Sequence, residues 1–118
     1  MNDSSDVLVV PTGTANTASV LAAFGRLDTR PRLCSDAAEL ARARFVVLPG
    51  VGAFAAAARR IDELLLRDVL RQRIEAGSPT LAICLGMQLF CAASEESPDL
   101  PGLGIVEGSV RRLSLIHI

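Results

Sequence analysis

Several residue types are rare or absent in this chain, and each absence excludes a class of function. The 118 residues contain no tryptophan and no tyrosine, so they lack the aromatic platforms on which the bases of single-stranded nucleic acids stack. There is no lysine; the 12 basic residues are all arginine, and the 13 acidic residues leave a formal net charge of −1. That balance offers no electrostatic basis for binding nucleic acid, and we expect no such partner.

Long apolar runs are also missing. None approaches the ~20 residues of a membrane span, and residues 1–6 lack the basic and apolar regions of a signal peptide. We therefore expect no membrane association and a cytoplasmic protein. The three cysteines, Cys34, Cys84 and Cys91, have neither C-x-x-C nor Cys/His spacing, which predicts no metal site and no disulfide framework. We interpret Cys34 and Cys91 as core or near-core thiols in a reducing compartment.

The residues that are present alternate in the pattern of an α/β domain. Half are apolar and 21% are charged, as in globular proteins, and the length allows one domain at most. Short apolar runs alternate with stretches of helical spacing, which predicts a mostly parallel sheet flanked by helices. Strands are expected at 7–10, 32–34, 45–48, up to residue 84 and at 108–112. Helices are expected at 17–24, 36–42, 53–76 and 85–93, the first and third stopped by Gly25 and Gly77.

The most informative segment runs from Thr80 to Gln88, TLAICLGMQ, where an apolar run ends at a cysteine and a helical pattern begins one residue later. This arrangement is typical of a nucleophile elbow, a tight turn between a strand and a helix that holds the nucleophile clear of the backbone. Cys84 would lie at the helix N-terminus, where unpaired amides and the macrodipole favour the reactive thiolate. Ala82 and Gly86 are as small as such a turn requires. A cysteine after an apolar run is also a common core residue, and this segment alone leaves that alternative open.

A second constellation, Pro49-Gly50-Val51-Gly52, follows the strand expected at 45–48. Ligands of open α/β sheets bind at the carboxyl ends of the strands. If this loop lies beside the elbow, the backbone amide of Val51 or Gly52, together with that of Leu85, would form an oxyanion hole. The alternative is a plain strand-to-helix turn.

Gln88 lies one helical turn beyond the elbow, on the side that faces back toward Cys84, and could reach a ligand held above the sulfur. Leu89 and Phe90 are expected to pack inward. A glutamine in this place is more often an exposed helix residue, and the acidic residues of the 94–98 loop would ordinarily be solvated. The residues alone leave both alternatives open.

Taken together, these segments resemble the class I, triad-type glutamine amidotransferases. The resemblance rests on ICLGMQL at 83–89, PGVGAF at 49–54, SEE at 94–96 and GLG at 102–104, with Gly108. Several amidotransferases share ICLGMQ, whereas PGVGAF and the SEE followed by GLG are similar to the glutaminase subunit of imidazole glycerol phosphate synthase. The resemblance runs from Val7 to about Arg112. It implies a flavodoxin-like α/β fold, of which this chain would hold the N-terminal part.

The resemblance implies glutamine hydrolysis, with Cys84 as the nucleophile that attacks the side-chain amide. It also implies that Gln88 and Glu96 hold the glutamine substrate, Glu96 near the α-amino group, and that Gly50 and Gly52 line the substrate and oxyanion side. The ammonia would pass to a partner, a cyclase subunit with a (β/α)8 barrel, in a heterodimer that makes imidazole glycerol phosphate and AICAR. No metal or organic cofactor is implied.

Three features depart from the family pattern. The first loop reads PTGTAN at 11–16 where the family has Asp-Tyr-Gly-x-Gly-Asn, and Ala82 stands where the family has glycine. The triad histidine and glutamate of the family lie in a downstream H-x-E segment, whereas the one histidine here is His117, to which we assign no role. A thiolate without a general base is a poor amidase, so these 118 residues are expected not to turn over glutamine.

The expected organisation is a disordered tail at 1–6, part of an amidotransferase domain at 7–112, and a terminal LSLIHI at 113–118 that resembles translated sequencing adapter. Two alternatives remain. A noncatalytic flavodoxin-like module that binds a small ligand or partner would account for Ala82, the altered loop and the missing dyad together. A glutaminase subunit of another pathway is the other alternative.

Overall fold

The computed structural model describes residues 5–13 and 16–113. His117, part of the first loop, residues 1–4 of the expected tail and residues 114–118 of the terminal hexapeptide lie outside the described residues. Within the tail expected at 1–6, Asp6 instead begins the first strand, and the carbonyl oxygen of Ser5 accepts a hydrogen bond from the backbone N–H of Arg30 at 2.8 Å. Asp6 therefore belongs to the sheet, and Ser5 is hydrogen-bonded to it.

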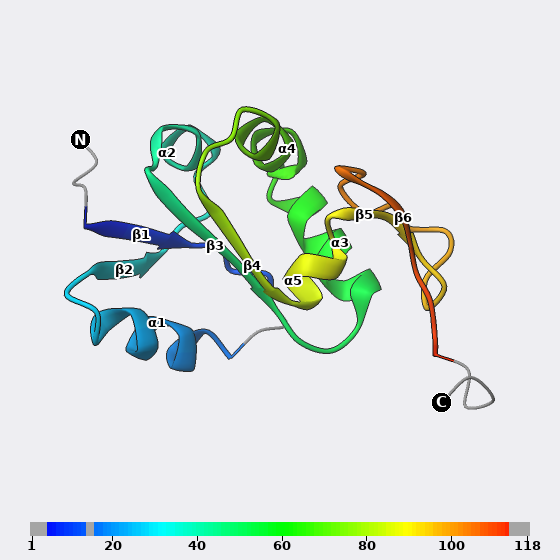
Figure 1. Ribbon diagram of the computed structural model, residues 1–118, viewed down its shortest axis with the longest axis horizontal. Coiled ribbons are helices and arrows are strands. Elements are labelled where there is room, and N and C mark those ends of the chain that lie inside the picture. The colour runs from blue at the N-terminus through cyan, green and yellow to red at the C-terminus, as the bar shows by residue number, and fades with distance from the viewer. Residues whose placement is uncertain (1–4, 14–15, 114–118) are drawn as a thin grey trace.

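The short apolar runs form a parallel sheet at the centre of the fold (Figure 1). Its strands are β1 (Asp6–Val9), β2 (Arg30–Leu33), β3 (Phe45–Gly50) and β4 (Thr80–Cys84). They lie in the order β2-β1-β3-β4, and every pairing is parallel, as predicted. β1 and β3 occupy the middle of the sheet and are almost entirely buried, which is why their sequences are continuously apolar rather than alternating.

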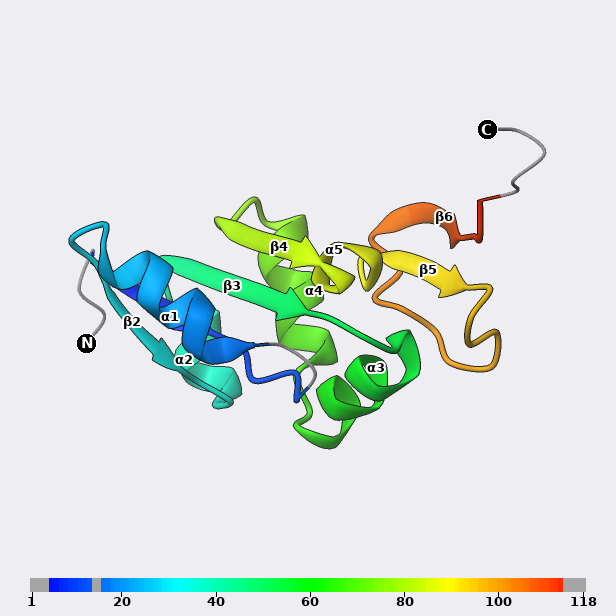
Figure 2. The same ribbon diagram turned by 90° about the horizontal axis from the view of Figure 1, so that it is seen from below.

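Helices cover both faces of this sheet (Figures 1 and 2). In chain order they are α1 (Thr17–Gly25), α2 (Ala37–Arg42), α3 (Phe54–Glu63), α4 (Arg67–Glu75) and α5 (Leu85–Gln88). On one face, apolar residues of α1 pack against Val7, Val9 and Val47. On the other face, Leu8 and Leu48 belong to the larger core, which also includes buried residues of α2, α3 and α4. The alternation of strand residues between two clusters confirms the layered α/β architecture.

Side-chain and glycine caps set several helix ends where the sequence places them. The Asn16 side chain accepts a hydrogen bond from the N–H of Ser19 at 3.2 Å at the start of α1. Asp36 accepts from the N–H of Glu39 at 3.1 Å at the start of α2, as its capping-box spacing predicts. Gly77, with φ of 80°, follows the end of α4 and confirms the predicted stop.

The single helix expected at 53–76 is wrong, because the chain breaks it into α3 and α4. Leu65 has φ of 58°; its N–H donates to the carbonyl oxygen of Asp62, and the N–H of Leu66 donates to that of Ile61, both at 3.0 Å. These two bonds form a Schellman ending, with leucine in the position that glycine usually takes. The sequence Leu-Leu-Leu at 64–66 continues the helical pattern and contains no glycine or proline, so it gives no signal of the break.

The helix expected at 85–93 is also wrong in its length, since α5 ends at Gln88. The backbone amides of Leu103 and Ile105 donate to the carbonyl oxygens of Leu89 and Phe90 at 2.6 and 2.9 Å. A longer α5 would use the same carbonyls for its own hydrogen bonds. The predicted inward packing of Leu89 and Phe90 is confirmed, with Leu89 buried and Phe90 packed against the core.

Residues after α5 build a small second sheet. β5 (Cys91–Ser94) pairs in parallel with β6 (Val106–Val110). The connection passes close to β5 at Gly102, where a Cβ atom would lie 2.0 Å from the carbonyl oxygen of Cys91. β6 begins and ends two residues before the strand expected at 108–112, so Arg111 and Arg112 follow the strand instead of lying in it.

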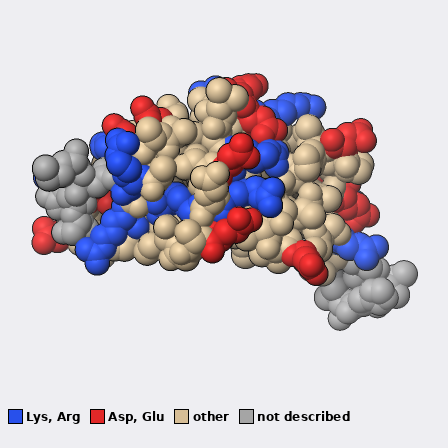
Figure 3. Space-filling view, turned by 90° about the horizontal axis from the view of Figure 1, so that it is seen from above, with Lys and Arg blue, Asp and Glu red and all other residues tan. Residues whose placement is uncertain are grey.

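The outer surface over α2 and α4 carries charges of both signs (Figure 3). Arg71 pairs with Glu75 at 3.4 Å and Arg67 with Asp62 at 2.7 Å, both at solvent-accessible positions. In the described part of the chain, no helix is both long enough and apolar enough to cross a membrane.

The edge strand β4 leaves apolar surface uncovered. Leu81 is 51% exposed and Ile83 is 37% exposed. A shallow cavity of about 450 Å³ lies along this side, lined mainly by apolar side chains that include Phe24, Phe45 and Leu81. Among the described residues, no strand pairs with the free edge of β4.

Candidate active site

The predicted turn between strand and helix is present at Cys84. This residue ends β4, and Leu85 begins α5. The backbone at Cys84 has φ of 55° and ψ of −115°. Residues other than glycine rarely adopt this conformation, which typically costs about 1–3 kcal/mol. The cysteine is exposed and forms no disulfide, so the structure contradicts the alternative that it is a core residue. Strain of this kind is common where a side chain must be held clear of the backbone for chemistry.

Gly86 is required by the packing of the turn. A Cβ atom at this position would lie 1.9 Å from the carbonyl oxygen of Leu48 and 2.9 Å from its carbonyl carbon. Both are backbone atoms of β3, which cannot move aside as a flexible side chain would. The close approach of α5 to β3 therefore depends on glycine two residues after the cysteine, as the sequence predicts.

The glycine loop lies beside the elbow because β3 and β4 are neighbours. In their parallel register Gly50 is the partner of Cys84. A Cβ atom on Gly50 would lie 3.1 Å from Cβ of Leu85 and 3.2 Å from the backbone nitrogen of Gly86. The hydroxyl of Thr12, a buried residue of the first loop, donates to the carbonyl oxygen of Pro49 at 3.0 Å. Three segments that are far apart in the sequence thus meet at the end of the sheet.

The backbone groups expected to form an oxyanion hole lie on both sides of this junction. Gly52 has φ of 90° and open space around it, and Val51 is 50% exposed, so the loop after β3 faces solvent. Leu85 directly follows the cysteine, with its side chain buried in the core. The structure brings these residues to one edge of the sheet, while their role in stabilising an oxyanion stays a prediction.

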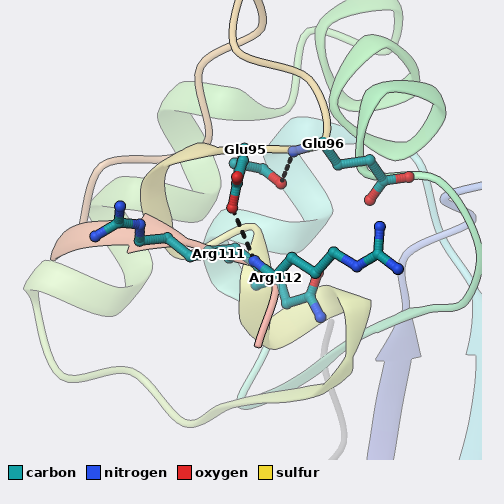
Figure 4. Close-up of a pocket in the computed structure, with 7 residues that line it drawn as sticks. Glu95, Glu96, Arg111 and Arg112 are labelled. Carbon is teal, nitrogen blue, oxygen red and sulfur yellow. Dashed lines mark hydrogen bonds between the residues drawn. The ribbon is translucent and has the colours of Figure 1, made fainter. Parts of the chain in front are cut away.

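Gln88 and Glu96 line one pocket, with a volume of about 510 Å³. The buried hydroxyl oxygen of Ser94 accepts a hydrogen bond from the backbone N–H of Glu96 at 3.2 Å (Figure 4). Glu95 is held differently, because its carboxylate accepts from the backbone N–H of Arg112 at 2.9 Å (Figure 4). The carboxylate of Glu96, unlike that of Glu95, forms no hydrogen bond with the backbone of Arg112, and Glu96 lines the pocket.

Cys84 does not line this pocket. The single turn of α5 separates the cysteine from Gln88, so the elbow and the pocket lie at opposite ends of one short helix. The structure brings Cys84 together with Gly50, and Gln88 together with Glu96, and joins the two pairs only through α5.

Four residues of this region, Thr12, Ser94, Arg111 and Arg112, were not predicted from the sequence. Thr12 lay in a loop that departs from the family pattern, and the signal it offered was only its position after the first strand. Ser94 was treated as part of an SEE motif and not as a cap. Arg111 and Arg112 line the pocket because β6 ends earlier than predicted, and nothing in the residue pattern identifies them.

Arg67 connects α4 to the loop before β6. Its guanidinium donates to the carbonyl oxygens of Pro101, at 3.1 Å, and Gly102. Its hydrogen bond to Asp62 raises the pKa of Arg67, so the guanidinium stays charged. Because Gly102 also donates its N–H to the carbonyl oxygen of Ala92, this contact supports the β5 and β6 pair that carries the pocket.

No group of three or more histidine, cysteine, aspartate or glutamate side chains among the described residues has the arrangement of a metal site.

Comparison with known proteins gives a consistent set of relatives. No family model matches the chain. It is 39% identical over 108 residues to the imidazole glycerol phosphate synthase subunit HisH of Oceanobacillus iheyensis. It is 43% identical over 105 residues to that of Chlorobium luteolum, and 44% identical over 103 residues to that of Methanopyrus kandleri.

These alignments cover 92%, 89% and 87% of this chain, but 54%, 52% and 51% of the three relatives. The chain therefore spans about half the length of the relatives that it matches. A solved structure, described as a crystal structure of glutamine amidotransferase, superposes with a TM-score of 0.74 at 23% identity, covering 89% of this chain and 56% of that one. This likeness supports the flavodoxin-like α/β fold.

Proposed function

We propose that this chain carries the nucleophile of a glutaminase. The premise is that it belongs to the HisH family of imidazole glycerol phosphate synthase subunits, over the half of those proteins that it spans. The single observation that carries the proposal is the strained, exposed Cys84 in register with Gly50. An elbow of this form has a chemical use and no evident structural one.

In the proposed reaction the sulfur of Cys84 attacks the side-chain amide carbon of glutamine and forms a thioester. The amide nitrogen takes up a proton and leaves as ammonia, and water then attacks the thioester to release glutamate and restore the thiol. The backbone amides of Leu85 and of Val51 or Gly52 would stabilise the oxyanion of each tetrahedral intermediate. Removing one such donor typically slows this class of reaction by about 10²–10³-fold.

Substrate binding is proposed for three side-chain or backbone positions near the elbow. Gly50 would line the substrate side of the elbow. A larger residue there would press on Leu85 and Gly86. Gln88 would contact the glutamine, and Glu96 would bind its α-ammonium group, which is the chemistry that an exposed carboxylate in a pocket offers.

The ammonia would serve a synthase partner subunit, which we propose to be a barrel cyclase in a cytoplasmic heterodimer. The proposal includes no metal or organic cofactor, because a thiolate, oriented amides and a proton-transfer group suffice for amide hydrolysis. The noncatalytic module and the glutaminase of another pathway stay as alternatives. Pull-down with the barrel cyclase of the same pathway tests the partner, and its absence from the eluate would favour the other pathway.

A proton-transfer group is the part that the 118 residues do not offer. They contain one histidine, His117, and no H-x-E segment. We therefore propose that these residues alone bind glutamine without turning it over, and that an ammonia-release assay on the 118-residue chain reads at background.

Labelling with an electrophilic glutamine analogue, 6-diazo-5-oxo-L-norleucine, tests the nucleophile directly. We expect one equivalent on Cys84 by mass spectrometry, prevented by L-glutamine but not by D-glutamine, and absent in Cys84→Ser. Cys91 is half-buried and provides the internal comparison. Equal labelling of Cys84 and Cys91 without protection by L-glutamine would support the noncatalytic module.

A further inference from the structure

We propose that Arg112 binds the α-carboxylate of the amino-acid substrate, so that Arg112 and Glu96 recognise its two charged ends. The inference rests on the proposed function, since it concerns the same glutamine. It assigns a specificity-determining role to a residue that neither the motifs nor the predicted elements identify. Arg112 and Glu96 both line the 510 Å³ pocket that also contains Gln88.

The opposite charges of Arg112 and Glu96 share one pocket without forming an ion pair with each other. Among the described residues, some surface arginines, such as Arg67 and Arg71, have carboxylate partners within 4.0 Å, whereas others, such as Arg59, have none. Neither Arg112 nor Glu96 forms an ion pair with any described residue, although both line one pocket. Two opposite charges that share a pocket without pairing suit a ligand that carries both charges itself.

Hydrogen bonds fix the backbone at both Arg112 and Glu96. The N–H of Arg112 donates to the carboxylate of Glu95 at 2.9 Å, and the N–H of Glu95 donates to the carbonyl oxygen of Val110 at 2.8 Å. On the facing segment, Ser94 accepts from the N–H of Glu96. These bonds set where both side chains begin, and binding then has to order only the side chains.

The side chains of Arg112 and Glu96 also point in a common direction. In Figure 4 the side chains of Glu96 and Arg112 extend to the same side of the pocket, whereas Arg111 extends to the opposite side. Arginine also has the geometry for the task, because its planar guanidinium donates two parallel hydrogen bonds to one carboxylate. An α-amino acid held between Arg112 and Glu96 leaves its side-chain amide free to extend toward Gln88 and the elbow.

The test combines a change in the protein with a change in the ligand. Isothermal titration calorimetry on the 118-residue chain compares L-glutamine with 4-aminobutanamide, which is glutamine without its carboxylate. Arg112→Gln is expected to weaken L-glutamine binding by roughly tenfold to a hundredfold, the usual loss for a charge-assisted hydrogen bond. The same substitution is expected to leave the affinity for 4-aminobutanamide unchanged.

Arg59→Gln is the matched control, since it removes the same charge from an exposed position of α3 that does not line the pocket. It is expected to change neither affinity by more than about twofold. Arg112→Lys keeps the charge but not the fork, and it is expected to retain part of the preference for L-glutamine.

Each outcome separates the two proposals. Equal weakening of both ligands by Arg112→Gln, or no weakening of L-glutamine, would overturn the role of Arg112 and leave the glutaminase proposal standing. If the unsubstituted chain binds L-glutamine no better than L-asparagine, the glutaminase proposal fails, and the role of Arg112 fails with it.

Discussion

The side chain at position 86 is limited by one carbonyl group. Because a Cβ there would lie 1.9 Å from the Leu48 oxygen, Gly86→Ala forces α5 away from β3. We expect the free energy of unfolding to fall by about 3 kcal/mol or more, and labelling of Cys84 by the glutamine analogue to slow. Urea denaturation measures the first effect and mass spectrometry the second.

Gly25→Ala is the control for this substitution. Gly25 is the last residue of α1, and a Cβ there would meet no atom within 4 Å. Alanine should leave stability unchanged or raise it by about 0.5–1 kcal/mol, as usual for this exchange in a helix. Equal destabilisation by both substitutions would contradict the close approach described at Gly86.

Arg73 is the buried charge of the fold, with 3% of its surface exposed. Its guanidinium donates to the carbonyl oxygens of Leu40 at 2.9 Å, Ala43 at 2.6 Å and Pro79 at 2.8 Å, and burial lowers its pKa. Arg73→Met removes the guanidinium donor from all three carbonyls, of which, among the described residues, only that of Pro79 keeps another donor, the N–H of Val46, and the substitution should cost about 2–4 kcal/mol in urea denaturation. Arg71→Met, at an exposed position of the same helix, should stay within about 0.5 kcal/mol. Similar losses in both variants would show that the buried hydrogen bonds contribute little.

At this scale the sequence predicted the residues whose chemistry follows from spacing. Cys84, Gly86 and the glycine loop could be predicted because an elbow needs a nucleophilic side chain and small residues at fixed distances from it. Ser94 and Arg112 could not, because their positions depend on where β5 and β6 end. That boundary is decided by hydrogen bonds between segments and leaves no local pattern.

The break between α3 and α4 offers a test of helix-ending strain. Leu65 holds φ of 58° and is 81% exposed, so its side chain contributes little burial to offset the conformation. Leu65→Gly should raise the free energy of unfolding by about 1 kcal/mol, since glycine adopts this conformation without steric cost. Leu27→Gly is the control, because Leu27 is similarly exposed but has an ordinary φ, and it should lower stability slightly. A loss of stability in Leu65→Gly would show that the leucine side chain packs usefully in solution.

The contact between β2 and α2 predicts a dependence on pH. The Cys34 thiol donates to Glu39 at 3.2 Å and Arg32 pairs with Glu39 at 2.9 Å, and these interactions lower the pKa of Glu39 below its ordinary value of 4.5. A lowered pKa in the folded state stabilises the fold above pH 4.5, and this contribution disappears as the pH falls through the folded pKa. Glu39→Gln should therefore be less stable than the unsubstituted chain at pH 7, and the difference should be smaller at pH 3.

Glu63→Gln, which changes an exposed partner of Arg60, provides the comparison for this pH series. Urea denaturation at both pH values measures the differences. A deficit in Glu39→Gln that is undiminished at pH 3 would show that the glutamate acts through packing and not through its charge.

Among the elements, those predicted well have a strong local signal at each end. β1, β3 and β4 are short apolar runs bounded by turn residues, and α2 begins at a capping aspartate, Asp36. The long helix at 53–76 and the helix at 85–93 were wrong for one reason: apolar residues at helical spacing do not reveal where a tertiary contact interrupts them.

The whole molecule has an uneven distribution of protection. Among residues 5–13 and 16–113, β1 and β3 are paired on both edges, while β4 has a free edge and a partly uncovered face. Amide hydrogen exchange should therefore be slowest in β1 and β3 and distinctly faster in β4. Native-state exchange followed by mass spectrometry at low protein concentration checks this order. Protection of β4 equal to that of β3 would mean that another surface covers the free edge in solution.

The parallel pairing of Gly50 with Cys84 also determines the order in which the two sides of the elbow are synthesised. Parallel neighbours cannot be joined by a hairpin, so β3 has no partner on this side until the chain about 34 residues later has been made. At the usual rate of about 5–20 residues per second, that interval is roughly 2–7 s. In that interval Gly50 has been added to the chain, while Cys84 and the elbow do not yet exist. Cys84 can therefore acquire its strained backbone only after β3, which already has β1 as a possible partner, gains β4 as its second neighbour.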